Sequence, residues 1–268
     1  MKEFLRQILN GVENPVLGRC LVREYLQARL LQSFQDKGVF NIWLFQGGTA
    51  LRFLYSMPRF SEDLDFALAK AGMEDNFRDI LLNARKTFEA EDYDISIKVN
   101  DTKTVKSAFV KFGGLLFELG LSAHRSETLS IKVEIDTNPP AGATCESTIV
   151  RRHVTLNLRH HDKASLLAGK LHAVLARRYI KGRDIYDLIW YLSDRSWPQP
   201  NIELLNNALV QTNWKGPEVT QDNWRHLLRE KVDKLKWASV VEDVEPFLQR
   251  PEDVKLLTKE NLVGLLQE

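Results

Sequence analysis

The sequence predicts a protein of the α+β class, with a mixed sheet in its middle part and a helical C-terminal domain. Between residues 40 and 137, short runs typical of strands lie between helical segments. From about His161 onward, every periodic segment has helical spacing. The 268 residues are enough for one large domain or two modest ones with a packed core.

Three regions are expected along the chain: N-terminal helices over 1–37, an α/β core over 38–158 and a helical domain over 159–268. The first region ends before Gly38, and its apolar residues have helical spacing at Leu21, Val22, Tyr25, Leu26 and Leu30. In the core, strands are predicted at 42–45, 62–68, 95–99 and 129–136, with helices from about Thr49 and over 74–89. Gly113-Gly114 lies between apolar runs at 108–112 and 115–119, which is the composition of a two-residue hairpin turn. Later helices are predicted at 163–178, 184–193, 202–210, 223–235 and 256–266.

Composition excludes several classes of protein. Apolar residues make up 44% and charged residues 27% of the chain, which is ordinary for a soluble globular protein. No run reaches the roughly 18–20 apolar residues of a membrane span, and the N-terminus lacks the apolar region of a signal peptide. Cys20 and Cys145 are too few for a disulfide framework and lack the close partners of a zinc site. We therefore expect a cytoplasmic protein with no membrane partner.

Residues 45–68 carry the clearest chemical pattern. A strand runs into Gly47-Gly48, and glycines at a helix N-terminus let backbone N–H groups approach a triphosphate. Downstream, Ser61, Asp63 and Asp65 share one strand face, and the two carboxylates are roughly 6.6 Å apart. Like charges so placed repel each other, but they suit divalent cations, which prefer carboxylate oxygens. The combination favours nucleotidyl transfer.

Two separated motifs resemble one family. Residues 47–52, Gly-Gly-Thr-Ala-Leu-Arg, and residues 59–65, Arg-Phe-Ser-Glu-Asp-Leu-Asp, are similar to the AbiEii/AbiGii toxins of the nucleotidyltransferase superfamily. Lys170 followed by Arg183-Asp184-Ile-Tyr-Asp187 is similar to that family's Lys…Arg-Asp-x-x-Asp element. The resemblance covers roughly residues 40–192. It implies a mixed-sheet nucleotidyltransferase domain packed against a helical C-terminal domain, acting as the toxin of a bacterial toxin–antitoxin or phage-defence pair.

The family resemblance also implies a metal site. Asp63 and Asp65 would be catalytic ligands of Mg²⁺, with Mn²⁺ as an alternative, in a site of two ions about 3.5–4 Å apart. A third carboxylate is expected on the strand over 131–136, where Lys132, Glu134 and Asp136 share one face. Alignment with the family selects Glu134, which would also take the proton of the attacking hydroxyl, and Asp136 remains the alternative. An exposed strand face on which Lys132 pairs with Glu134 would have the same pattern.

The nucleotide is expected to contact the glycine turn. Gly47, Gly48 and the Thr49 hydroxyl would bind the β- and γ-phosphates, while a plain tight turn is the alternative for the glycines. Ser61 would hydrogen-bond a phosphate oxygen or steady a carboxylate, or it would cap its own backbone.

The second motif is expected on helices. Lys170 would bring its ammonium group to the triphosphate and, with Asp184, is counted among the catalytic residues. Asp184 and Asp187 are three residues apart on one helical face and would steady Lys170 or contact the nucleotide. Alternatively, Asp184 begins its helix near the positive end of the dipole, and Asp187 pairs with Arg183 or Lys181.

Charge is divided unevenly along the chain. Residues 62–94 hold ten acidic and four basic residues, a balance of −6, whereas residues 151–183 hold nine basic residues and one acidic residue, a balance of +8. The basic window could attract the triphosphate, a polynucleotide or both, or it could be a solvated helix face. The resemblance implies an RNA acceptor, in particular the 3′ end of tRNA, or a protein hydroxyl, and also a cognate antitoxin. A catalytically silent scaffold that binds nucleic acid or a partner, and a metal-dependent nuclease, are the alternatives.

Overall fold

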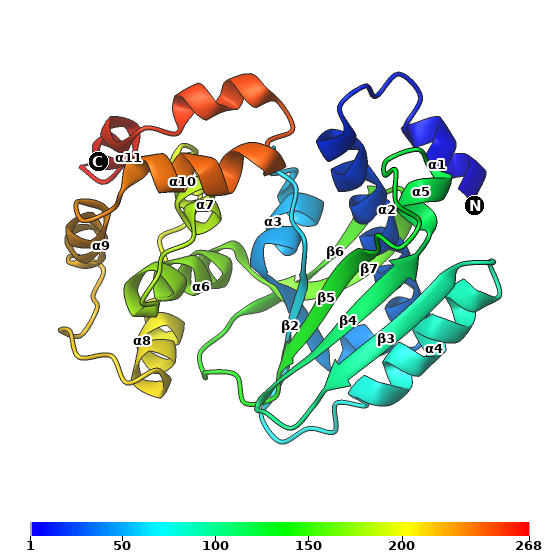
Figure 1. Cartoon of the computed structure of the whole chain (residues 1–268). Coiled ribbons are helices and arrows are strands. Elements are labelled where there is room, and N and C mark those ends of the chain that lie inside the picture. Colours follow the sequence, from blue (N-terminus) through cyan, green and yellow to red (C-terminus); the bar gives the residue numbers. More distant parts are fainter. Residues whose placement is uncertain (1, 268) are drawn as a thin grey trace. The chain divides into compact units, whose positions relative to one another are not determined.

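The computed structural model describes residues 2–267 (Figure 1). The described chain divides into two compact units. The first comprises the residues up to Tyr55, together with Phe60–Pro139 and Ser147–His160. The second comprises Ser56–Arg59, Pro140–Glu146 and the residues from His161 onward. The chain therefore passes between the units several times.

The first unit is built on a mixed sheet that has seven strands within residues 2–267, in the order β3-β4-β5-β2-β1-β7-β6. The strands are β1 (Trp43–Gln46), β2 (Leu64–Leu68), β3 (Asp94–Asn100), β4 (Val105–Gly113), β5 (Leu129–Asp136), β6 (Cys145–Arg152) and β7 (Val154–His161). β2 is parallel to β5, and β1 is parallel to β7. β2 is antiparallel to β1, and β4 is antiparallel to β3 and β5. The mixed sheet beside numerous helices confirms the predicted fold class.

Helices of the first unit pack against its sheet. They are α1 (Lys2–Ile8), α2 (Pro15–Asp36), η1 (Val39–Asn41), α3 (Gly47–Tyr55), α4 (Phe77–Glu89) and α5 (Leu115–Glu118). The Asn14 side chain accepts hydrogen bonds from two backbone N–H groups, and Pro15 occupies the first turn, so α2 begins with a strong N-terminal signal. α4 lies along β3 (Figure 1) and also contacts α2. A buried ring cluster of Phe34, Trp43 and Phe66 joins α2 to the sheet.

The second unit is helical apart from the end of the sheet. It contains α6 (Lys163–Ala176), α7 (Gly182–Leu192), α8 (Ile202–Gln211), α9 (Trp224–Val232), α10 (Trp237–Val244), η2 (Glu245–Phe247), η3 (Pro251–Leu256) and α11 (Lys259–Leu265). α7 packs against α6, α10 and α11. A Cβ at Gly182 would lie 2.9 Å from the Val240 Cα, so a glycine is required where α7 meets α10. Among residues 2–267, no helix has both the length and the hydropathy of a membrane span.

Most predicted elements are confirmed with small shifts of their ends, but the hairpin is wrong. Val105–Gly113 is one strand that pairs with β3 and β5, and Leu115–Glu118 is a short helix. Gly114 has a φ of 63° and starts that helix. Leu115 and Leu116 are both buried, whereas a strand would place adjacent side chains on opposite faces. The helix expected from Thr49 begins at Gly47, and β6, β7 and α10 were not predicted.

Candidate active site

Gly47 brings the start of α3 against the Asp65 side chain. The strand β1 ends at Gln46, and Gly47 has a φ of 79°, in the left-handed region that favours glycine. A Cβ built at Gly47 would overlap Oδ2 of Asp65 and would lie 3.0 Å from both Cβ and Cγ of that residue. Glycine is therefore required both for the backbone and for the space that the carboxylate occupies. The acid lies where the N-terminal N–H groups of α3 begin.

Strand register brings Glu134 beside Asp65. Asp65 is the register partner of Gln46 on β1 and of Glu134 on β5. Register partners on neighbouring strands lie side by side on one face of a sheet, with strands about 4.8 Å apart. Asp136 is instead level with Ala67, two residues farther along β2. This register favours Glu134 over Asp136 as the acid that accompanies Asp65.

The face of β5 that carries Glu134 is half-buried, while the opposite face is buried, as the alternation predicted. The Lys132 ammonium lies 2.7 Å from Oε1 of Glu134, so this carboxylate has a cation partner. Within residues 2–267, no group of three or more His, Cys, Asp or Glu side chains is arranged to hold a metal ion. Carboxylate oxygens at the end of a glycine turn are nevertheless the donors that Mg²⁺ prefers, so the residues suit this ion chemically. The three-carboxylate site remains a prediction.

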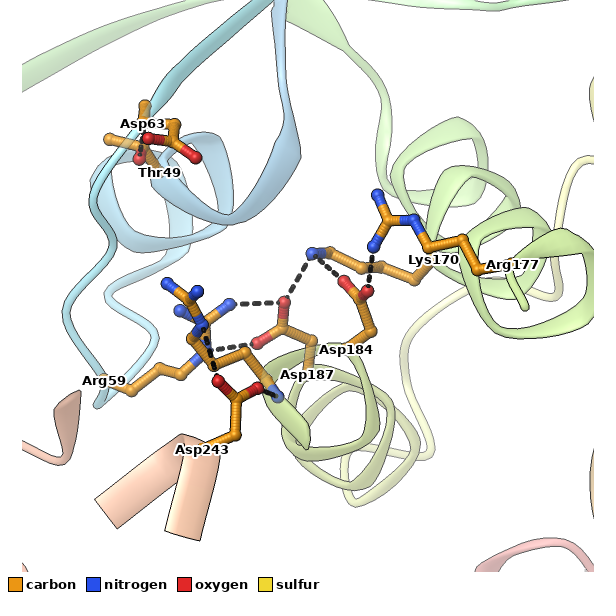
Figure 2. A network of polar contacts seen from close by, with 9 residues as sticks. Thr49, Arg59, Asp63, Lys170, Arg177, Asp184, Asp187 and Asp243 are labelled. Atoms are coloured by element: carbon orange, nitrogen blue, oxygen red, sulfur yellow. Dashed lines mark hydrogen bonds and ion pairs between the residues drawn. The ribbon is translucent and has the colours of Figure 1, made fainter. Parts of the chain in front are cut away.

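Thr49 fixes the backbone from which Asp63 projects. Its hydroxyl donates a hydrogen bond to the Asp63 carbonyl, as Figure 2 shows, and its side chain is fully buried. β2 begins only at Leu64, so Asp63 precedes the regular ladder and this carbonyl is held by a side chain instead. The contact of the Thr49 hydroxyl with phosphate stays a prediction. Ser61, two residues earlier, is half-buried, and its carbonyl accepts a hydrogen bond from Gln27 at 3.1 Å.

In the second unit, Lys170, Asp184 and Asp187 form a network of ion pairs with two arginines (Figure 2), in which Arg177 is exposed and the other members are largely buried. The Lys170 ammonium lies 2.9 Å from Oδ1 of Asp184 and 2.7 Å from Oδ2 of Asp187. Arg59 donates two hydrogen bonds of 2.6 Å to the two carboxylate oxygens of Asp187. Arg177 donates one of 2.6 Å to Asp184. Three cations therefore surround two carboxylates.

Burial and pairing set the charge states of this network. Burial alone would lower the pKa of Lys170, but Asp184 and Asp187 outweigh it and raise that pKa above its usual value. Burial would raise the pKa of Asp184, but Lys170 and Arg177 outweigh it and lower that pKa. Lys170 is therefore cationic and Asp184 anionic at neutral pH. An ammonium has three donors, and the two carboxylates accept from two of them, which leaves one for a further acceptor.

Asp187 pairs with Lys170, as one interpretation of the sequence predicted, and does not make the ion pair offered as the alternative. Its partners are Arg59 and Lys170 rather than Arg183 or Lys181. The Arg183 guanidinium lies 3.8 Å from the Asp243 carboxylate on α10. Arg59 comes from the loop between α3 and β2, and this pairing over a long stretch of sequence has no local signal.

Buried polar residues of α2 were also missed. Glu24 is buried and accepts from Arg52 on α3, with the Arg152 and His153 side chains 3.1 and 3.3 Å from its Oε1. Gln27 is 1% exposed. The buried residues of α2 lie on most sides of the helix, so no apolar stripe in the sequence marks Glu24 or Gln27 as buried.

Two solved structures have a similar fold. A candidate nucleotidyltransferase from H. pylori superimposes with a TM-score of 0.57 at 18% identity, covering 92% of this chain and 93% of that chain. The protein JHP933 from Helicobacter pylori superimposes with a TM-score of 0.55 at 19% identity, covering 92% of this chain and 90% of that chain. At these identities the likeness shows the fold alone. No curated protein matches the sequence.

The family comparison covers most of the chain. The model described as "Nucleotidyl transferase AbiEii toxin, Type IV TA system" matches residues 29–258. This stretch contains the glycine turn, both aspartates, the Glu134 strand and the Lys170 network. The chain therefore belongs to the AbiEii family of nucleotidyltransferase toxins from type IV toxin–antitoxin systems.

Proposed function

We propose that this chain transfers a nucleoside monophosphate from a nucleoside triphosphate to a hydroxyl of an RNA acceptor in a metal-dependent reaction. The observation that carries the proposal is the register of Asp65 with Glu134, at the place where Gly47 begins α3. The bond between the acceptor oxygen and the α-phosphorus forms, and the bond from the α-phosphorus to the bridging oxygen breaks. Pyrophosphate leaves, and the hydroxyl proton passes to a carboxylate, for which Glu134 is proposed.

The residues of the first unit divide these tasks. Asp63, Asp65 and Glu134 would hold Mg²⁺, or Mn²⁺ in its place. When bound, such an ion stabilises charge on the attacking and leaving oxygens. Backbone N–H groups at Gly47 and Gly48 would donate to the β- and γ-phosphates, because the start of a helix presents such donors with a favourable dipole. Nucleotide binding by Lys170 is a separate proposal, supported by its remaining donor.

The loop between α6 and α7 supports an RNA acceptor. It runs over residues 177–181, Arg-Arg-Tyr-Ile-Lys. Tyr179 is 75% exposed, and the Arg178 guanidinium lies 5.3 Å from the centre of its ring. Exposed aromatic rings beside cationic side chains are typical of surfaces that bind single-stranded nucleic acid, because every base can stack on them. A protein hydroxyl as acceptor has no such support. Family membership adds a cognate antitoxin as the proposed regulatory partner.

The central experiment identifies donor and acceptor together. Purified protein is incubated with MgCl₂, each labelled nucleoside triphosphate in turn, and total cellular RNA or protein. We expect label in RNA, release of pyrophosphate, and loss of both in Asp65→Asn. Asp79→Asn is the matched control, because Asp79 is an exposed acid of α4 outside the site. Full activity in Asp65→Asn would contradict the site, label in protein would contradict the RNA acceptor, and shortened unlabelled RNA would indicate a nuclease.

The acceptor surface is tested by Tyr179→Ala. Loss of one base stack weakens binding by about 1–3 kcal/mol, so the KM for RNA should rise roughly 5- to 150-fold while the KM for the triphosphate is unchanged. Tyr179→Phe should keep wild-type values because it retains the ring. Val210→Ala removes an equally exposed apolar side chain from α8 and serves as the control. An unchanged KM for RNA in Tyr179→Ala would remove the support for this surface.

A further inference from the structure

The backbone that precedes Asp63 is held from outside the sheet. The pairing of β2 with β1 and β5 covers residues from Leu64 to Leu68, so Ser61 and Asp63 lie before the ladder. Their carbonyl groups need other partners, since a buried carbonyl without one is costly. Gln27 donates to the Ser61 carbonyl at 3.1 Å, and Thr49 donates to the Asp63 carbonyl.

Both donors are placed rigidly. Gln27 is 1% exposed and Thr49 is 0% exposed, so neither side chain can exchange its bond for one with bulk water. Gln27 lies on α2, where Arg23, one turn earlier, is 3.7 Å from the Glu62 carboxylate. α2 therefore contacts two successive residues of the segment that leads into the aspartates. Glu24 on the same helix pairs with Arg52, which joins α2 to α3 through a buried ion pair.

The Ser61 carbonyl belongs to the peptide plane that precedes the Glu62 Cα, and the Asp63 carbonyl belongs to the plane that follows the Asp63 Cα, so the two hydrogen bonds hold the Glu62-Asp63 dipeptide at both ends. The direction in which the Asp63 carboxylate projects then depends on both hydrogen bonds. We infer that Gln27 is a positioning residue for Asp63, acting through the Ser61 carbonyl. The inference rests on the proposed function, in which Asp63 is a metal ligand. It also makes α2 part of the active-site framework, although Gln27 precedes residues 29–258 that match the family.

The decisive variant is Gln27→Met, which keeps the length of the side chain and removes the donor. Groups that orient a metal ligand typically change metal affinity or activity by 10- to 100-fold, so we expect kcat to fall about tenfold or more. The affinity for Mn²⁺, measured by electron paramagnetic resonance with a non-hydrolysable triphosphate, should fall with it. The KM for RNA should stay unchanged. Backbone amides of residues 60–65 should exchange hydrogen faster than in the wild type.

Gln35→Met is the matched control. Gln35 lies on the same helix and also makes one hydrogen bond to backbone, accepting from the Asn157 N–H at 2.6 Å. The variant therefore loses one side-chain to backbone bond without touching the segment before Asp63. It should keep wild-type kcat, Mn²⁺ affinity and exchange over residues 60–65.

Gln27→Glu gives a second readout that a general loss of packing would not produce. A protonated carboxyl group can donate to the Ser61 carbonyl, but a carboxylate cannot. The activity of this variant relative to wild type should therefore rise as pH falls, because protonation restores the donor. This test also serves if Gln27→Met does not fold.

The outcomes distinguish a failure of the proposed function from a failure of the positioning role of Gln27. A wild-type protein with neither transfer nor Mn²⁺ binding would refute the proposed function, and the exchange data would still report on the backbone. An active wild type with Gln27→Met equal to Gln35→Met, in both kcat and exchange, would refute the positioning role. A flat relative pH profile for Gln27→Glu would do the same.

Discussion

Replacing Gly47 by alanine should remove activity by displacing Asp65. Gly47 has a φ of 79°, and an alanine in the left-handed region costs about 1–2 kcal/mol. Reduced freedom of the unfolded chain returns roughly 0.4–1 kcal/mol. The new methyl group also meets Asp65, whose Cβ and Cγ both lie 3.0 Å from it. Rotation about the Cα–Cβ bond of Asp65 moves its Cγ but not its Cβ, so β2 itself must shift. Such overpacking adds about 1–3 kcal/mol.

Gly72→Ala separates the cost of backbone strain from the cost of steric overlap with Asp65. Gly72 has a φ of 80° and belongs to the same unit, but a Cβ there meets no atom within 4 Å. Urea unfolding followed by circular dichroism should show a loss of about 1 kcal/mol for Gly72→Ala and roughly 2–4 kcal/mol for Gly47→Ala. Transfer of labelled nucleotide should survive in Gly72→Ala alone. Equal losses of stability together with retained transfer in Gly47→Ala would refute the close approach of Asp65.

Further predictions address the two units separately. Arg59→Ala should destabilise the protein by about 3–5 kcal/mol in urea, because it leaves the Asp187 charge buried without its bidentate partner; a loss below 1 kcal/mol would contradict this. Burial opposes ionisation of Glu24, but His153 and two arginines outweigh it and lower its pKa from 4.5 to about 2. The group therefore contributes about 3 kcal/mol above pH 4.5, and this is lost as pH falls towards 2; Glu24→Gln should flatten that part of the profile. Glu134→Gln should reduce transfer far more than Asp136→Asn, and the opposite ranking in the same assay would move the third acid to Asp136.

Patterns within a few residues predicted the central part of the fold well. The alternation over residues 129–136 gave β5 with its observed ends, and the glycine turn before Asp63 and Asp65 located the start of α3 within two residues. Such patterns depend on the local period of side chains, which a single sequence shows directly. β7 has the same alternation, with Leu156 and Leu158 buried and Thr155 and Asn157 exposed, so the sequence contained a signal for this strand that was missed. β6 gives little signal, because Val150 is its one buried residue. Gly113-Gly114 gave a wrong prediction of a hairpin, because glycine composition alone does not distinguish a hairpin turn from the start of a helix.

The candidate site was predictable in residue type but not in contacts. The choice of Glu134 over Asp136 depends on the register of β5 against β2, which residues far apart in the sequence determine. The pairing of Arg59 with Asp187 spans 128 positions and likewise has no local periodicity. Gln27 was overlooked because a buried glutamine is recognised only when its acceptor is known. Long-range pairing therefore accounts for what the sequence did not reveal.

The discontinuous second unit limits how this protein can be divided. Ser56–Arg59 belongs to that unit, although it lies in the chain between α3 and β2. There Arg59 forms a bridge with Leu248, and the Gln249 N–H donates to the Pro58 carbonyl at 3.1 Å. A fragment that begins near His161 would keep Asp187 but lack its arginine, and a fragment that ends there would carry Arg59 without an acid. The C-terminal half cannot be inherited, fused or exchanged between relatives as an independent module, because Ser56–Arg59 and Pro140–Glu146, which complete its unit, are encoded before it.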